Sequence, residues 1–237
     1  MDWRIGCSGF YYKEWKEFFY PEGLPQKRWF EYYCEHFNTI EINSSFYRQP
    51  SPKSFENWYN TSPADFLFTI KAPRAITHYS KFNQAKILIN EFYEVISAGL
   101  KDKLGCVLFQ MPPSFSYNEE RLELLLNSLK NGFNNVVEAR HISWWNKTVF
   151  DEFSKRHIIF SGISYPSALP DDTIQNTDIV YYRFHGRPVL YKSLYNTQEI
   201  TTFSNSIHPE KQQVYVYFNN TWGTSAITNA KELQLLK

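Results

Sequence analysis

The sequence predicts an α/β fold, a single (β/α)8 TIM barrel with an irregular sixth connection, on three observations. Eight short apolar runs recur along the 237 residues at spacings too long for hairpins. Amphipathic stretches lie between most of these runs, as parallel strands covered by helices require. A doubly wound open sheet is disfavoured, because "GCSG" at 6–9 lacks the third glycine of a phosphate-binding fingerprint.

The eight apolar runs are the predicted strands. They cover 3–7, 39–43, 66–72, 104–111, 136–140, 157–163, 179–185 and 214–219. Helices are predicted over 25–37, 51–60, 85–100, 118–130, 145–156, 197–207 and 225–237. Ser51 and Pro52 are a helix cap and first helical residue, and Ser143 is a candidate cap before 145–156. The sixth gap, 164–178, contains "YPSALPDD" and predicts an irregular connection.

The composition is that of a globular protein, with 43% hydrophobic and 21% charged residues. No Pro/Gly/Ser-rich linker interrupts it, so we expect one domain over 1–237. No apolar run approaches the ~18 residues that a membrane span needs, and the first residues lack a signal-peptide layout. Three cysteines without a C-x-x-C pair predict reduced thiols and a cytoplasmic location. The sequence does not decide the oligomeric state.

Side-chain alternation separates an apolar face from a polar face in six of the eight predicted strands. In each of the six, the polar residues share one parity and lie toward the C-terminal end. The apolar face of a barrel packs against helices, so the polar sets should converge on the axis, where barrel active sites are built. The converging ionisable residues are Glu41, Lys71, Glu138, Arg140, Arg183 and His185.

The charge of this set predicts a pocket for a small anionic ligand, phosphate- or nucleotide-like, although the chain's net charge is only +1. Glu41, Glu138 and His185 are the candidate acid–base groups of a hydrolase or lyase. Gly186 follows the seventh strand, where backbone N–H groups often hold phosphate. The candidate ligand-binding residues are Asn43, Tyr47, Lys71, Gln110, Arg140, His141, Trp144, Tyr181, Arg183, Gly186, Arg187, Tyr217 and Asn219.

A structural role for the same charges stays open. Buried charges must be paired, so Glu138 with Arg140 or Arg183, and Glu41 with Lys71, are expected ion pairs even in a non-catalytic ligand-binding or scaffold protein. A paired acid and base acting on a sugar is disfavoured, because the nearby cations would hold both carboxylates ionised.

A metal-dependent, nuclease-like barrel acting on nucleic acid is a further alternative. Trp144 and Trp145 would stack on bases, and Glu41 and His185 would hold a divalent metal. No H-E-x-x-H or H-x-H spacing occurs, and neighbouring cations would repel a metal, so no metal ligands are assigned and no cofactor is predicted. Ser8 is expected to act as a cap or turn residue.

Seven blocks, in order along nearly the whole chain, resemble the YecE-like family, also called domain of unknown function 72. The blocks are "IGCSGFYYKEW", "FNTIEINSSFYRQP", "FTIKAPRAITH", "LGCVLFQMPPSF", "VVEARHISWW", "YYRFHGR" and "VYVYFNN". The resemblance implies a TIM-barrel fold and supplies no reaction. Thr221 stands where His or Asp is often found, which argues against a mechanism that needs a charged group there.

Overall fold

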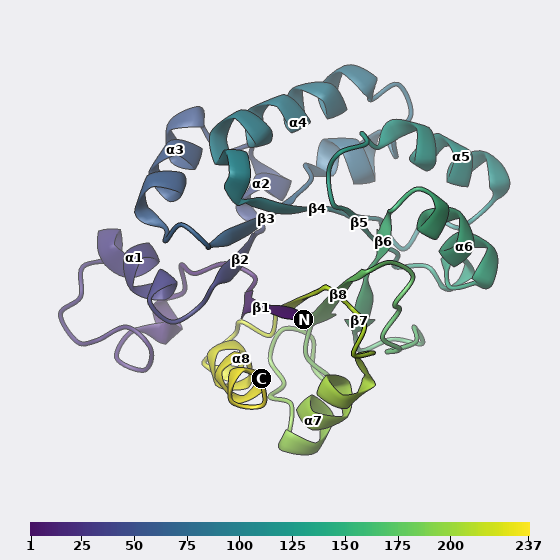
Figure 1. Cartoon of the computed structure of the whole chain (residues 1–237). Helices are drawn as coiled ribbons and strands as arrows, with labels where there is room; N and C mark the ends of the chain where they lie inside the picture. The colour runs from purple at the N-terminus through teal and green to yellow at the C-terminus, as the bar shows by residue number, and fades with distance from the viewer.

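A computed structural model describes residues 1–237 as two parallel sheets with helices on their outer faces (Figure 1). The strands are β1 (Asp2–Cys7), β2 (Thr39–Ile42), β3 (Leu67–Lys71), β4 (Leu104–Gln110), β5 (Asn135–Glu138), β6 (Ile159–Phe160), β7 (Gly162–Ser164), β8 (Ile179–Phe184) and β9 (Gln213–Phe218). One sheet has the order β2-β3-β4-β5-β6 and the other β1-β9-β8-β7. Seven of the eight predicted strands exist with bounds close to those expected, and the sixth divides into β6 and β7.

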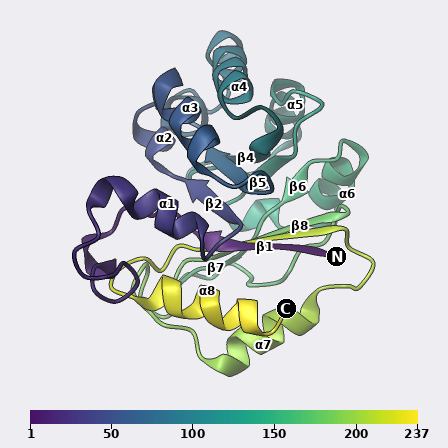
Figure 2. The same ribbon diagram turned by 60° about the vertical axis from the view of Figure 1, so that its left-hand side comes forward.

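Apart from the short α2, which lies at the carboxyl end of β2, the helices lie on the sides of the sheets that face away from the interior (Figure 1). They are α1 (Trp29–Cys34), α2 (Ser44–Tyr47), α3 (Pro52–Thr61), α4 (Lys86–Leu100), α5 (Glu119–Ser128), α6 (Lys147–Lys155), α7 (Thr197–Ser206) and α8 (Ser225–Leu235). Figure 2 shows α3, α4 and α5 beyond the five-stranded sheet, and α7 and α8 beyond the four-stranded one. Shorter helical turns cover Lys13–Trp15, Gln26–Arg28, Ala75–Tyr79, Lys101–Lys103 and Ile142–Trp144.

The prediction of one closed (β/α)8 barrel is wrong, because backbone hydrogen bonds join the strands into two sheets. Side chains occupy the joint between β1 and β2. The Tyr33 hydroxyl accepts from the Cys7 N–H at 2.8 Å and donates to the Thr39 carbonyl at 3.1 Å. The Asn38 amide donates to the Trp3 carbonyl at 2.9 Å. Backbone groups that would otherwise pair β1 with β2 are satisfied in this way.

The second break lies within the sixth predicted strand, 157–163, which divides into β6 and β7. β6 pairs with β5, and β7 pairs with β8. Between them, the Ser161 N–H donates to the Val137 carbonyl at 2.9 Å and its hydroxyl donates to the Gly162 carbonyl at 3.0 Å. The segment 159–164 thus contributes one short strand to each sheet. The irregular connection predicted after it is confirmed, since 164–178 contains no helix.

The predicted alternation of apolar and polar faces is confirmed by two separate apolar clusters. The larger, of 54 buried residues, contains the helix-facing strand residues such as Ile40, Val107 and Phe218. The smaller has seven buried residues of the opposite parity, drawn from both sheets, and so lies in the interior between them. Its members are Cys106, Leu108, Val136, Ile159, Tyr181, Tyr215 and Tyr217.

Capping residues fix where the helices begin. The Ser51 hydroxyl accepts from the Ser54 N–H, and Pro52 opens α3, as the sequence predicts. The prediction that Ser143 caps 145–156 is wrong: α6 begins at Lys147, and the Asn146 side chain accepts from the Val149 N–H. Ser143 instead lies in the short helical turn before it.

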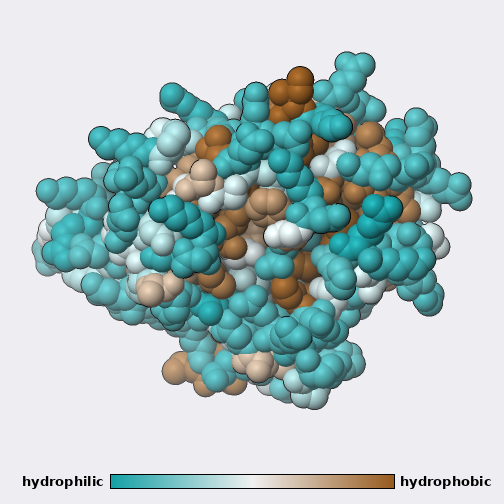
Figure 3. All heavy atoms as spheres, turned by 45° about the horizontal axis from the view of Figure 1, so that its top comes forward, coloured by the Kyte–Doolittle hydropathy of each residue, from teal (hydrophilic) through white to brown (hydrophobic).

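The surface is mostly polar. On the face shown in Figure 3, hydrophilic side chains cover most of the area and hydrophobic ones form separate patches. None of the helices combines the length and apolar character that crossing a bilayer requires. All three cysteines are buried and free, as the sequence predicts.

Candidate functional site

Arg183, on β8, lies at the centre of a charge network near the carboxyl ends of the strands. Its Nη2 donates to Glu41 Oε1 on β2 and its Nη1 to Glu138 Oε2 on β5, both at 2.6 Å. All three side chains are essentially inaccessible to solvent. Since β8 belongs to one sheet and β2 and β5 to the other, this network joins the two sheets across the interior. The Arg183 Nε atom is buried without a partner.

The Glu41 carboxylate is fully engaged. Ser8 Oγ donates to Oε1 at 2.6 Å, and the Tyr181 hydroxyl donates to Oε2 at 2.5 Å. The expectation that Ser8 only caps or turns the chain is therefore wrong. In β1 the odd-numbered Ile5 and Cys7 face the helices, so the alternation of side chains places the even-numbered Ser8 in the interior.

The Glu138 carboxylate contacts two guanidinium groups and one imidazole. Arg140 Nε donates to Oε1, while Oε2 contacts Arg183 and, at 3.2 Å, His185 Nε2. Burial alone would raise the pKa of Glu138, but the guanidinium groups of Arg140 and Arg183 outweigh it and lower that pKa well below the usual value. Glu138 is thus ionised near neutral pH and cannot serve as a proton donor there.

His185 lies directly after β8 and contacts both charge types. Its Nε2 is 3.1 Å from Arg140 Nη2, and its Nδ1 is 2.9 Å from Asn219 Nδ2. Burial lowers the pKa of His185 well below its usual value, and the two guanidinium groups lower it further. The imidazole is therefore neutral. The Glu138 carboxylate favours a proton on Nε2, and so does the Asn219 amide, because its Nδ2 can only donate to Nδ1. The Arg140 guanidinium instead favours a lone pair on Nε2.

Lys71, the last residue of β3, is the cation in the site that forms no ion pair. Its side chain packs against the Phe46 ring, with Nζ 4.2 Å from the ring centre, and donates to Gln110 Oε1 at 2.7 Å. The predicted pairing of Glu41 with Lys71 is wrong, because Arg183 takes that carboxylate. Burial, together with the charge of Arg183, lowers the pKa of Lys71 to about 7.

Half-buried polar residues complete the site at the strand ends. Asn43 follows the last paired residue of β2, beside β3, and its Oδ1 is buried without a partner. The Arg140 guanidinium lies over the Tyr165 ring, 4.0 Å from its centre. Gln110 and Asn219 contribute amides from β4 and from the residue after β9. Hydrogen bonds join Gln110 to Lys71, and Asn219 and Arg140 to His185, so these groups meet at the strand ends.

Three predicted binding residues form no hydrogen bond or ion pair with the charge network. Trp144 is in the core, where its Nε1 donates to the Phe115 carbonyl at 2.7 Å, so neither ring face is open to a ligand. Tyr47 is 70% exposed at the surface. The His141 Nδ1 accepts from the Ser143 N–H at 3.2 Å and caps a short turn, which places it in the loop after β5.

Tyr217, another predicted binding residue, lies deeper in the interior than the charge network. Its hydroxyl is 2.6 Å from Thr39 Oγ1 and 2.9 Å from Thr69 Oγ1, so it forms hydrogen bonds between the two sheets. Burial raises the pKa of this phenol well above its usual value, and the group is neutral. Tyr217 therefore helps to hold the two sheets together beneath the charge network.

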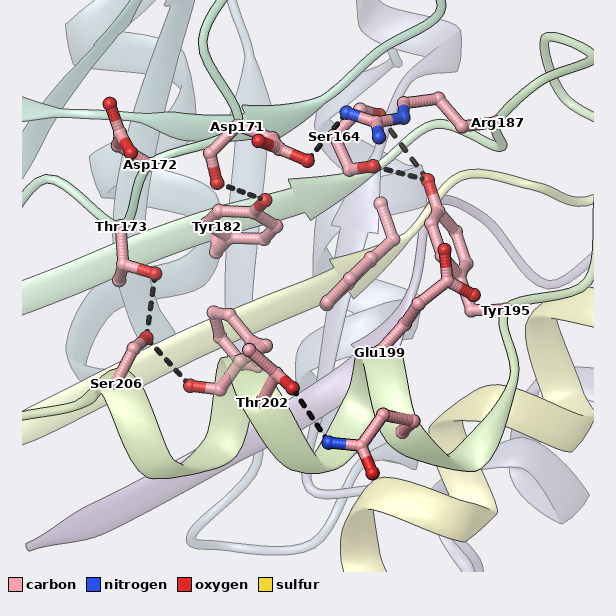
Figure 4. A pocket seen from close by; sticks show the side chains of 13 residues that line it. Ser164, Asp171, Asp172, Thr173, Tyr182, Arg187, Tyr195, Glu199, Thr202 and Ser206 are labelled. Carbon is pink, nitrogen blue, oxygen red and sulfur yellow. Dashed lines mark hydrogen bonds and ion pairs between the residues drawn. The ribbon is translucent and has the colours of Figure 1, made fainter.

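Gly186 and Arg187 lie on the outer side of β8. The Gly186 N–H, expected to be free for phosphate, donates to the Tyr195 hydroxyl at 2.9 Å. Arg187 pairs with Asp171 and lines a cavity of about 420 Å³ between β8 and α7, which Figure 4 shows. None of the charged interior residues lines this cavity. No group of three or more His, Cys, Asp or Glu side chains is arranged to hold a metal ion.

Fold and site together define an α/β protein with two parallel sheets and a buried Glu–Arg network across them. The family model described as "Protein of unknown function DUF72" matches residues 4–236, so the chain belongs to the DUF72 family. The likeness identified from the seven sequence blocks is thereby confirmed.

Relatives and solved structures agree with this assignment. The UPF0759 protein YunF of Bacillus subtilis is 26% identical, over 90% of this chain and 88% of that protein. The UPF0759 protein YecE of Escherichia coli K12 is 30% identical, over 60% of this chain and 56% of its own length. The crystal structure of a DUF72 family protein from Thermotoga maritima is 28% identical, covers 100% of this chain and 99% of its own, and gives a TM-score of 0.89.

Proposed function

We propose that the protein binds a small anionic ligand, phosphate- or nucleotide-like, at the carboxyl ends of its strands. The observation that carries this proposal is the ammonium group of Lys71, 8% exposed and without a carboxylate partner. The other four charges of the site, on Glu41, Glu138, Arg140 and Arg183, neutralise one another. An anion would supply the missing negative charge.

Arg140 is the second cationic contact in this proposal. It uses Nε and Nη2 in contacts with Glu138 and His185, and leaves Nη1 without a protein partner. The half-buried amides of Gln110 and Asn219 add donors for a polar ligand. Hydrolase or lyase chemistry would use neutral His185 to move protons, with Glu138 holding His185 and both guanidinium groups in position.

Thermal unfolding with added anions tests the proposal. Orthophosphate and AMP should raise the Tm of the wild-type protein, because a ligand at about 100 times its Kd adds about 2.7 kcal/mol to the free energy of unfolding. Lys71→Met and Arg140→Met should lose this increment, while Lys86→Met, at the exposed start of α4, should keep it. If no anion raises the wild-type Tm, the proposal is wrong; a larger rise with a single-stranded oligonucleotide would favour the nuclease-like alternative.

A scaffold role is the second candidate, and the burial of Arg183 favours it. A guanidinium group with no solvent access that bridges two sheets through two carboxylates holds the fold together, whatever binds above it. On that alternative the network is needed for stability, and neither phosphate nor AMP changes the Tm. The same anion titration therefore distinguishes the two candidates.

A further inference from the structure

Two lysines of this chain are buried, and their hydrogen bonding differs. Lys103 is 6% exposed, and its Nζ donates to the Tyr59 carbonyl at 2.6 Å, the Ser62 carbonyl at 2.7 Å and Ser62 Oγ at 3.0 Å. All three of its N–H bonds are used. Lys71 has one protein partner, Gln110. A buried ammonium that lacks two partners is poorly explained by structural need alone.

The surroundings of Lys71 favour a neutral amine with a free lone pair. Burial and Arg183 lower the pKa of Lys71 to about 7, so roughly half of the molecules carry the amine at neutral pH. The ring of Phe46 lies against the side chain. The other charged and titratable groups that act on it are Glu41, Glu138, Arg140, Arg183 and His78.

We infer that Lys71 is a nucleophile that forms an imine with the carbonyl group of an anionic aldehyde or ketone, an inference that rests on the proposed anion site. The Nζ lone pair attacks the carbonyl carbon, and the π electrons of the C=O bond move to oxygen. That oxygen takes both N–H protons and leaves as water, while the nitrogen forms a double bond to carbon. The neutral imine then takes one proton from solvent and becomes the protonated imine. No oxidant, reductant or cofactor is consumed.

This chemistry selects the lyase alternative. A protonated imine withdraws electrons from the neighbouring carbon and so promotes cleavage of a bond to that carbon. Protonation of the imine puts a positive charge on the same nitrogen, so the anionic group keeps a cationic partner. Arg140, through its free Nη1, would hold the anionic group, and neutral His185 beside it would move protons.

Reductive trapping tests the inference in the intact protein. Glyoxylate, pyruvate or glyceraldehyde 3-phosphate would be added with cyanoborohydride at pH 7, and each lysine's modification rate followed by peptide mass spectrometry. Lys103 is the buried control, because all three of its N–H bonds are engaged, so Lys71 should react at least about tenfold faster than Lys103. Acetaldehyde, which lacks the anion, should show a smaller preference for Lys71.

The Lys71→Arg variant separates this inference from the proposed function. It keeps the cation, so phosphate should still raise its Tm, but it cannot form an imine. If Lys71 in the wild-type protein reacts no faster than Lys103 with any of the three anionic probes, the inference is wrong. Stabilisation by phosphate, measured on the same wild-type sample, then decides the proposed function on its own.

Discussion

At the residue scale, we expect the buried side chain of Lys71 to lower the free energy of unfolding of the wild-type protein. We expect Lys71→Met to raise the free energy of unfolding at pH 7.5 by about 1–3 kcal/mol, because it removes a buried charge with a single neutral partner. The pKa of Lys71 is about 7 in the folded protein and about 10.5 in the unfolded chain. Between these values only the unfolded chain holds the proton, so wild-type stability from this group rises with pH. Urea titrations at pH 7.5 and 10 measure both effects.

Lys103→Met is the matched control for this prediction. It leaves the carbonyls of Tyr59 and Ser62 without their donor, so we expect a loss of about 2–4 kcal/mol. A comparable loss in Lys71→Met would show that Lys71 is structural, against the function proposed for it.

Arg183 should behave in the opposite way to Lys71. Arg183→Met leaves the buried carboxylates of Glu41 and Glu138 without their shared cation, and we expect a loss of about 3–5 kcal/mol. The exposed pair of Arg187 with Asp171 is the control, and Arg187→Met should cost less than about 1 kcal/mol. Urea unfolding at pH 7 measures both, and equal small losses would contradict a structural network.

Acid should also destabilise the network. The pKa of Glu138 is depressed in the folded protein, so its contribution to stability is present above the unfolded-state value of about 4.5 and is lost as the pH falls below it.

At the element scale, the Tyr33 hydroxyl is the group that bonds the backbone of both β1 and β2 at their joint. Tyr33→Phe leaves the Cys7 N–H and the Thr39 carbonyl buried without partners, so we expect a loss of about 2–3 kcal/mol. The exposed Tyr11, which bonds Gln26, gives the control, and Tyr11→Phe should change stability by less than about 0.5 kcal/mol. Denaturant unfolding measures both; a negligible effect at Tyr33 would show that the joint is held by other contacts.

The same joint explains what alternation can and cannot predict. Residue parity correctly placed Glu41, Glu138 and Arg183 in the interior, because a strand that packs against helices must keep one face apolar. Parity carries no information on which neighbouring strands share hydrogen bonds. The hydroxyl of Tyr33, from a helix, and the break at Ser161 both depend on three-dimensional contacts that no periodic pattern contains.

The misplaced site residues have a similar cause. Trp144 follows β5 closely, and the sequence predicts that it binds the ligand together with Arg140. The loop instead turns Trp144 into the core against Phe115, a direction set by tertiary packing. The predicted pair of Glu41 with Lys71 was wrong for another reason. Alternation along a strand identifies which residues face the interior, but which of them pair depends on how the strands of the two sheets are positioned.

At the scale of the whole molecule, the two sheets should unfold as one unit. The network of Arg183 with Glu41 and Glu138, and the bonds of the Tyr217 hydroxyl to Thr39 and Thr69, all cross from one sheet to the other. The cluster of 54 buried residues also draws on strands of both sheets. Neither sheet can lose its packing without exposing buried charge and apolar surface of the other, which favours a cooperative transition.

We therefore expect far-UV circular dichroism and tryptophan fluorescence to give coincident urea transitions, with equal calorimetric and van't Hoff enthalpies. The tryptophans make this comparison informative, because Trp3 lies in β1 of the four-stranded sheet and Trp144 follows β5 of the five-stranded sheet. In Arg183→Met the sheets lose their strongest link, so the transitions should broaden or separate. Separate transitions in the wild-type protein would mean that the sheets are independent units and would contradict the single domain predicted over 1–237.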